Sequence, residues 1–191
     1  MDKPFNIPPG EVETLGVGPN TFVSMGNLPK DVAKQFDTID ETIRSSNFTS
    51  TEEYNHALVG HIKKEFTVPT DLQTNNMRTF LLWLAGCTIN NDPGLKNLFS
   101  NVKHEPVADL LNADNMWINY MQKYEFNPVH NHSGLLSWVV WNKIPFNIED
   151  EMKVFPDVKN PNAGTFNFLF DAPIKQIALP VDRDMENYIC M

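Results

Sequence analysis

The sequence predicts an α+β domain in which helices from the first half pack outside an antiparallel β-sandwich or barrel formed by the second half. Two observations predict this class. In the first half, apolar residues recur every three or four positions, which is the period of an amphipathic helix. From about residue 115 the period changes to two, which is typical of strands. With 191 residues, of which 41% are hydrophobic and 20% charged, the chain is long enough to bury one core.

Residues 1–28 are rich in proline and glycine, and we expect an extended lead-in with one strand at residues 21–25. Residues 29–114 carry the helical signals and are expected to support the β-structure. The first helix is expected after Pro29, a residue tolerated in a first helical turn. Its apolar stripe would consist of Val32, Phe36, Ile39 and Ile43.

Two further helices are expected in this region. Ser50 with Glu53 resembles a capping box, and Thr70 with Gln73 repeats the pattern before an apolar stripe that would end at Gly86. A short helix is also expected at residues 106–111. Residues 115–191 are predicted to form the β-sandwich, so that the whole chain is one structural domain. The strands are expected at residues 118–126, 135–144, 165–170, 174–179 and 188–191.

The charge balance argues against two classes of partner. The chain carries a formal net charge of −9, and its lysines and arginines form no patch, so neither nucleic acid nor an anionic membrane surface is an expected partner. The longest apolar run, residues 80–87, is too short to cross a bilayer. The N-terminus lacks the layout of a signal peptide, and with two cysteines in the chain the expected location is the cytoplasm.

The most distinctive segment is a His-x-His pair, His130 and His132, just after a predicted strand. In an extended backbone, residues two apart point the same way, so both imidazoles can reach one metal ion. Neutral imidazole suits iron, zinc, copper and nickel alike, so the pair does not choose the metal. The alternative is two solvated histidines at the end of a strand.

Two other families share parts of this pattern. A cupin would place a glutamate three or four positions after the pair, and the residues found there include Leu136. The letters also spell HNH, but that nuclease motif is spread over a longer ββα unit, and an acidic chain is a poor nuclease candidate. A zinc or nickel cupin-like protein stays as a third alternative.

The sequence around the pair resembles that of a particular group of proteins. Trp117-Ile118-Asn119 is followed by Glu125-Phe126-Asn127-Pro128, then by His130 and His132, then by Leu136-Ser137, Val139-Val140-Trp141 and Pro145. This order is similar to that of the 2-oxoglutarate- and iron(II)-dependent dioxygenases, specifically the prolyl-hydroxylase-like proteins of marine phages, including cyanophages. The resemblance is tight over residues 115–145 and loose over residues 20–191.

The resemblance implies a double-stranded β-helix with flanking N-terminal helices. It implies Fe(II) as the metal and 2-oxoglutarate as co-substrate, and the hydroxylation of an unactivated C–H bond, with a peptidyl proline as one candidate substrate. Such an enzyme would act in the cytoplasm, which for a viral protein is that of the host.

Residue by residue, His130 matches the first metal-binding histidine. His132 stands where typical prolyl hydroxylases have an aspartate, so it is either a second neutral ligand or stands aside from the metal. Asn119 and Ser137 are the candidates for binding 2-oxoglutarate, and Trp141, on the same strand face as Ser137, for lining the substrate pocket. The alternatives are an ordinary strand asparagine at position 119 and a core aromatic at position 141.

The chain departs from the family pattern after this segment. No histidine follows His132, and the one arginine that follows, Arg183, lies in a predicted turn, so the second iron histidine and the arginine that pairs with 2-oxoglutarate are not found. We expect a β-helix that lacks its last strands, either shortened or remodelled and inactive. Its open edge near residues 188–191 could then form an oligomer contact. The rival interpretation is a non-catalytic structural or binding module of a virus.

Overall fold

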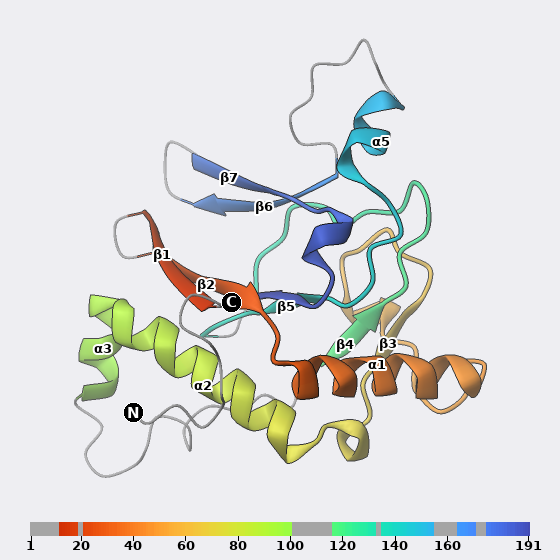
Figure 1. Ribbon diagram of the computed structural model, residues 1–191, viewed down its shortest axis with the longest axis horizontal. Helices are drawn as coiled ribbons and strands as arrows, with labels where there is room; N and C mark the ends of the chain where they lie inside the picture. Colours follow the sequence, from red (N-terminus) through yellow and green to blue (C-terminus); the bar gives the residue numbers. More distant parts are fainter. Residues whose placement is uncertain (1–11, 19–20, 101–115, 133–134, 155–163, 171–174) are drawn as a thin grey trace.

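The computed structural model describes residues 12–18, 21–100, 116–132, 135–154, 164–170 and 175–191. The protein is a mixed α+β structure in which every strand pairing is antiparallel (Figure 1). The helices are α1 (Lys30–Ser45), α2 (Asn75–Asn91), α3 (Pro93–Ser100) and α5 (Ile148–Lys153), with short 3-10 turns at Asn55–Ala57, Thr70–Leu72 and Arg183–Met185. The strands are β1 (Val12–Gly18), β2 (Thr21–Asn27), β3 (Glu65–Thr67), β4 (Trp117–Asn119), β5 (Val139–Trp141), β6 (Thr165–Phe170), β7 (Lys175–Pro180) and β8 (Tyr188–Cys190).

The largest sheet has the order β1-β2-β8-β5 and combines strands from both ends of the chain. The strand predicted at residues 21–25 is confirmed as β2, whereas β1 was not predicted. β8 lies between β2 and β5 and pairs with both, so the expected open edge at residues 188–191 is wrong. Within the described residues, the edges of this sheet are β1 and β5.

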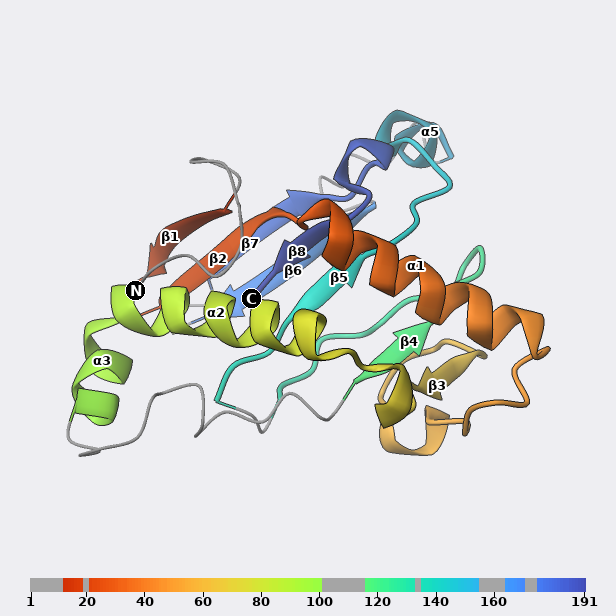
Figure 2. The ribbon, with the colours of Figure 1, turned by 60° about the horizontal axis from the view of Figure 1, so that its bottom comes forward.

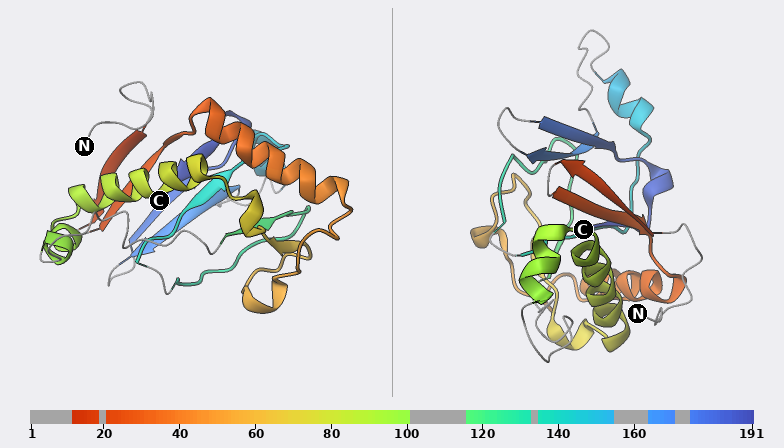
Figure 3. Two further views of the ribbon diagram at one scale, coloured as in Figure 1. Left: turned by 90° about the horizontal axis from the view of Figure 1, so that it is seen from below. Right: turned by 90° about the vertical axis from the view of Figure 1, so that its left-hand side faces the viewer.

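The sheet separates two layers of structure. In Figures 2 and 3, α1 and α2 cross one face, and the β6–β7 hairpin lies over the other. Ile189 of β8 faces the helices and belongs to the hydrophobic core. On the opposite face, Trp141 of β5 packs its ring edge-on against Phe166 of β6, at 5.4 Å between centroids. Side chains along β5 and β8 therefore alternate between the two faces and pack against both layers.

The core on the helix side is built from two helical stripes. In α1 the predicted stripe is confirmed, since all four of its apolar residues are buried; in α2 the buried stripe is wider than a single face. Burial of each such side chain stabilises the fold by about 1.5–3 kcal/mol. The buried apolar residues are Val32, Ala33, Phe36, Ile39 and Ile43 in α1 and Met77, Phe80, Leu81, Leu84, Ala85 and Ile89 in α2.

Helix α2 begins and ends later than predicted. Its N-cap is Thr74, whose hydroxyl accepts a hydrogen bond from the Met77 amide at 3.3 Å, rather than Thr70. The predicted stop at Gly86 is wrong, because the following turn buries further side chains and continues the helix to Asn91. Asp92 separates α2 from α3. Its Oδ1 accepts a hydrogen bond from the backbone amide of Gly94 at 2.8 Å, in the first turn of α3.

The helix predicted after Ser50 is wrong. Residues 48–68 instead form a turn, a single 3-10 turn and the strand β3. The Asn55 side chain stabilises this irregular path, since its amide donates to the Ile62 carbonyl at 2.7 Å and its oxygen accepts the Glu65 amide at 3.3 Å. The region predicted to be helical therefore contributes a strand, which pairs with β4.

The predicted strands of the second half occur, with different lengths. β6 has the predicted bounds, β7 begins and ends one residue later than predicted, and β8 ends one residue earlier. β4 and β5 are three residues each, and α5 follows β5 with Asn147 as its N-cap. The helix predicted at residues 106–111 lies outside the described residues. None of the described helices is long and apolar enough to cross a membrane.

Candidate metal site and its surroundings

The ribbon formed by β3 and β4 has one apolar and one polar face. Phe66 and Ile118 lie opposite each other and pack toward the hydrophobic core. Glu65 and Asn119 form the next cross-strand pair and therefore project from the other face, as does Trp117, two residues before Asn119. This polar face carries the sequence-predicted Asn119 and begins the candidate site.

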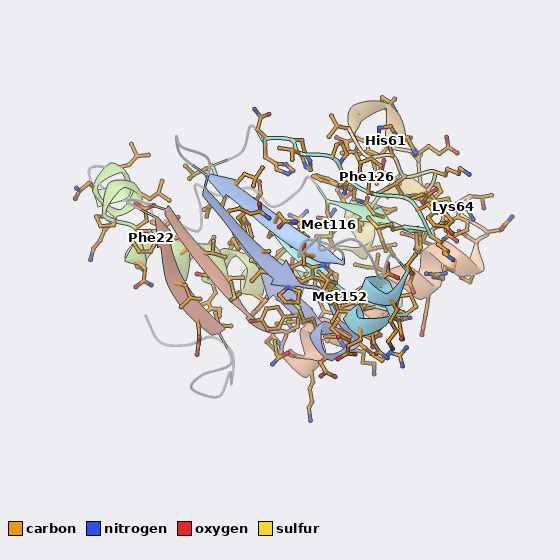
Figure 4. All side chains as sticks on the ribbon, turned by 90° about the horizontal axis from the view of Figure 1, so that it is seen from above. Phe22, His61, Lys64, Met116, Phe126 and Met152 are labelled. Carbon is orange, nitrogen blue, oxygen red and sulfur yellow. The ribbon has the colours of Figure 1, made fainter. Side chains whose placement is uncertain are left out.

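The segment that leads from β4 to the histidines is held against the residues preceding β3. Glu125 accepts the Gln122 amide at 2.9 Å and the Lys63 amide at 3.3 Å. The His61 amide donates to the Phe126 carbonyl at 2.8 Å, and the two rings stack at 5.0 Å between centroids (Figure 4). These contacts fix the backbone a few residues before His130.

The two histidines are brought together. The Nε2 atoms of His130 and His132 lie 3.0 Å apart, and the His130 Nδ1 lies 2.8 Å from the Pro128 carbonyl. Because a carbonyl can only accept, Nδ1 of His130 carries a proton and its Nε2 offers a lone pair. In the metal-free protein that lone pair accepts the Nε2–H of His132. A backbone carbonyl on the far nitrogen is the support that metal-binding histidines usually have.

Trp117 supports the second histidine. The rings of Trp117 and His132 are stacked, with centroids 6.2 Å apart and planes inclined by 19°. Partial burial, together with the neighbouring His130, lowers the pKa of His132 below the ordinary value. His132 therefore stays neutral to lower pH than a free histidine, and the neutral form is the one that binds metals.

If both histidines bind one metal ion, the pair would supply two of the three protein ligands that the resemblance implies. Two adjacent ligands of an octahedral ion, at metal–nitrogen distances of about 2.1 Å, are about 3.0 Å apart, against about 3.4 Å in a tetrahedral site. The 3.0 Å between the two Nε2 atoms is the length of the hydrogen bond between the rings, and it equals the spacing of two adjacent octahedral ligands. Among the described residues, however, no group of three or more His, Cys, Asp or Glu side chains could hold a metal ion. Within the described residues the pair alone would therefore make only part of such a site.

The remaining predicted site residues lie on the sheet side away from the helices. Leu136, Trp138 and Val140 pack against the core, which directs the alternating residues Ser137 and Trp141 to the opposite face. Ser137 is exposed. Trp141 is half-buried, with its ring 5.4 Å from that of Phe166 and 6.5 Å from that of Tyr188.

The described residues offer limited support for binding an anionic co-substrate. The Asn119 Oδ1 is buried without a hydrogen-bond partner among them, so the side chain is able to bind an incoming group. Arg183 is exposed and donates to the Pro145 carbonyl at 3.1 Å, where it stabilises the turn before β8. Asn119 therefore fits a binding role, whereas Arg183 has a structural one.

Sequence reasoning missed Glu65. Its side chain is 1% exposed, lies opposite Asn119, and has both carboxylate oxygens buried without a partner among the described residues. Burial, together with the nearby Glu125, raises the pKa of Glu65. The signal was the short alternation of polar and apolar residues from Glu65 to Val68.

No protein-family model matches the chain, and comparison with curated proteins and with solved structures found no significant match. The geometry of the chain's own residues therefore carries the functional argument.

Proposed function

We propose that this chain is a metal-binding domain of the 2-oxoglutarate- and iron(II)-dependent oxygenase type, which hydroxylates an unactivated C–H bond, with a peptidyl proline as the substrate group. One observation carries the proposal: the Nε2 atoms of His130 and His132 lie 3.0 Å apart, as two adjacent ligands of one metal ion do. When bound, iron(II) with 2-oxoglutarate and oxygen supplies the oxidising chemistry, and 2-oxoglutarate leaves as succinate and carbon dioxide.

The residues of this chain divide the work of binding. His130 and His132 hold the metal, and the Pro128 carbonyl and the Trp117 ring keep the two imidazoles in place. Asn119 contacts 2-oxoglutarate from the polar face of β4. In this proposal, Ser137 contacts the co-substrate and Trp141 the substrate, from the sheet side that faces the β6–β7 hairpin. The domain works in the cytoplasm, that of the host if the protein is viral, on a peptide or protein substrate.

Metal titration tests the central claim. Mn(II), which replaces Fe(II) without oxidation, is titrated into the protein and followed by its electron paramagnetic resonance signal. We expect the wild type to bind one ion, His130→Ala to lose binding, and His132→Ala to weaken it by about tenfold or more.

His56→Ala is the matched control, because His56 is an exposed histidine on a 3-10 turn and no part of the pair. Equal binding by wild type, His130→Ala and His132→Ala would exclude a metal site at the pair. Succinate release from 2-oxoglutarate, with Fe(II) and oxygen present, then tests the reaction itself. A chain that binds metal but releases no succinate would restrict the proposal to metal binding.

A second candidate is a non-catalytic binding or structural module on the same fold. The observation that favours it is the missing third ligand in the described part of the chain. This candidate predicts that the melting temperature does not change when Fe(II) or Mn(II) is added. The oxygenase proposal predicts an increase, because a ligand that binds only the folded state stabilises it.

A further inference from the structure

Glu65 is a buried carboxyl group that has no hydrogen-bond donor in the part of the chain that the structure describes. Its side chain is 1% exposed, and neither Oε1 nor Oε2 has a partner within the described residues. The Oδ1 of Asn119, the residue directly opposite on β4, is also buried and without a partner there. Leaving such a group unsatisfied costs about 1–3 kcal/mol, and more when it is charged, so buried acceptors in folded proteins nearly always have a donor.

A third oxygen lies beside this carboxyl group, next to Gly60. A Cβ atom built on Gly60 would lie 2.4 Å from the Asn127 Oδ1, 2.9 Å from the Glu65 Oε1 and 3.4 Å from the Glu65 Oε2. Three oxygens from two separate segments therefore converge beside the Cα atom of Gly60, where a side chain on residue 60 would crowd them. Asn127 is exposed, so it marks the side from which a ligand reaches the buried carboxyl group.

The electrostatic surroundings favour a cation. Glu125 lies close enough to act on Glu65 through its charge, and the chain as a whole carries a net charge of −9. The Glu65 carboxylate and the Asn119 Oδ1 lack donors among the described residues, so a ligand that brings its own N–H groups is complementary to them. A primary ammonium group brings three such donors and a positive charge in a compact volume.

We propose that Glu65, Asn119 and Asn127 form a subsite that binds the ammonium group of an amine ligand. The ionised carboxylate of Glu65 accepts hydrogen bonds from one or two N–H groups of the ammonium. The amide oxygens of Asn119 and Asn127 accept hydrogen bonds from the other N–H groups. The subsite lies on the same ribbon face as Trp117, on which His132 stacks. It goes beyond the proposed oxygenase function and does not require a metal ion.

Binding of matched model compounds tests the subsite. Isothermal titration calorimetry compares N-acetyl-lysine N-methylamide, which carries the ammonium group, with N-acetyl-norleucine N-methylamide, which lacks it. We expect only the lysine compound to bind the wild type. Glu65→Gln keeps the shape and removes the charge, and should weaken binding by about tenfold or more. Glu53→Gln is the control. It removes a carboxylate charge from an exposed residue whose backbone forms an isolated β-bridge with Phe66 of β3, and it should leave binding unchanged.

Asn127→Asp separates the subsite from an internal alternative. If the Asn127 amide nitrogen donates to Glu65, a carboxylate at position 127 repels Glu65, destabilises the fold and abolishes binding, which overturns the proposal. If the three oxygens form a subsite for a cation, the second carboxylate strengthens binding of the lysine compound. Equal binding of the two model compounds, or unchanged binding in Glu65→Gln, also overturns it, as does the absence of binding to the folded wild type.

Two further arms complete the test. His130→Ala should bind the lysine compound as the wild type does, so failure of the amine subsite and failure of the metal site are distinguished. Comparison of n-butylamine with N-acetyl-Gly-Lys-Gly-amide identifies the source of the ammonium group. Tighter binding of the peptide indicates a lysine side chain, and equal binding indicates a free small amine. Either result supports the subsite.

Discussion

Asp40 shows how a single buried charge joins distant parts of the chain. It is almost fully buried on α1 and accepts Arg44 Nε at 2.7 Å and Lys143 Nζ, from the segment after β5, at 3.0 Å. Burial alone would raise the pKa of Asp40, but the hydrogen bonds from Arg44 and Lys143 outweigh it and hold the pKa below the ordinary 3.8. The ionised form therefore contributes to the attachment of α1 to the sheet.

Asp40→Asn should lower the free energy of unfolding by about 1–3 kcal/mol, a modest cost for a buried carboxylate because both cationic partners are half-exposed. Since the folded pKa lies below the unfolded one, the contribution is complete above the unfolded pKa and is lost as pH falls through the folded pKa. Urea unfolding between pH 7 and pH 2 should show the two proteins converging only in acid. Asp37→Asn is the control, because Asp37 is more exposed and lies 3.9 Å from Lys143. A constant difference down to pH 2 would contradict this account.

His132 should titrate below an ordinary histidine. Its burial and the neighbouring His130 both lower its pKa from 6.5. We expect its midpoint, followed by imidazole NMR signals in the metal-free protein, to rise toward 6.5 in His130→Gln, because that variant removes the neighbouring imidazole and keeps the burial. A wild-type midpoint at or above 6.5 would show that the pair is not arranged as described.

At the scale of elements, long periodic segments were predictable and short ones were not. The apolar stripe of α1 consists of four residues spaced three or four positions apart, and all four are buried as predicted. The Ser50–Glu53 capping pattern was misleading because Asn55 directs its side chain to local backbone groups and favours an irregular path. β3 and β4 have three residues each, and such strands depend on pairing with a distant partner, which a local pattern does not reveal.

Two glycines provide a matched pair of substitutions. A Cβ atom on Gly86, inside α2, would meet nothing within 4 Å. Gly86→Ala should therefore increase the free energy of unfolding by about 0.5–1 kcal/mol, because alanine is the better helix former and restricts the unfolded chain. Thermal unfolding followed by circular dichroism measures the change.

Gly60→Ala should have the opposite sign. Its Cβ atom would lie 2.4 Å from the Asn127 Oδ1, which is closer than any real contact, so Asn127 and the Glu65 carboxylate must shift. We expect a lower melting temperature together with weaker binding of the lysine compound. The exposed Asn127 side chain can swing aside, so a neutral Gly60→Ala would show that the buried Glu65 carboxylate is also free to move.

At the scale of the molecule, the α+β class and the antiparallel pairing were predicted, and the double-stranded β-helix remains a prediction. The His130–His132 contact was predicted because it depends on two residues of one extended segment. Glu65 and Asn127 were not, because their meeting point at Gly60 depends on how two separate segments fold against each other. A single sequence gives no local signal for such convergence.

The shared core predicts one cooperative unfolding transition. The same hydrophobic cluster contains residues of α1, α2, β3 and β8, so none of these elements keeps its buried surface when another leaves. Far-ultraviolet circular dichroism reports the helices, and tryptophan fluorescence reports Trp83, Trp117, Trp138 and Trp141. The two urea curves should coincide. Two separate transitions would show that the helices and the sheet unfold independently.

The position of β8 has a consequence for the order of folding. β1 and β2 are neighbours in sequence and can pair as soon as both exist, but β2 and β5 become parts of one sheet only after β8 enters between them. Closing the long loop between β2 and β8 carries an entropic cost that is recovered only after both of its ladders form. During synthesis on the ribosome, the helices and the β1–β2 hairpin would therefore be present before the four-stranded sheet is complete.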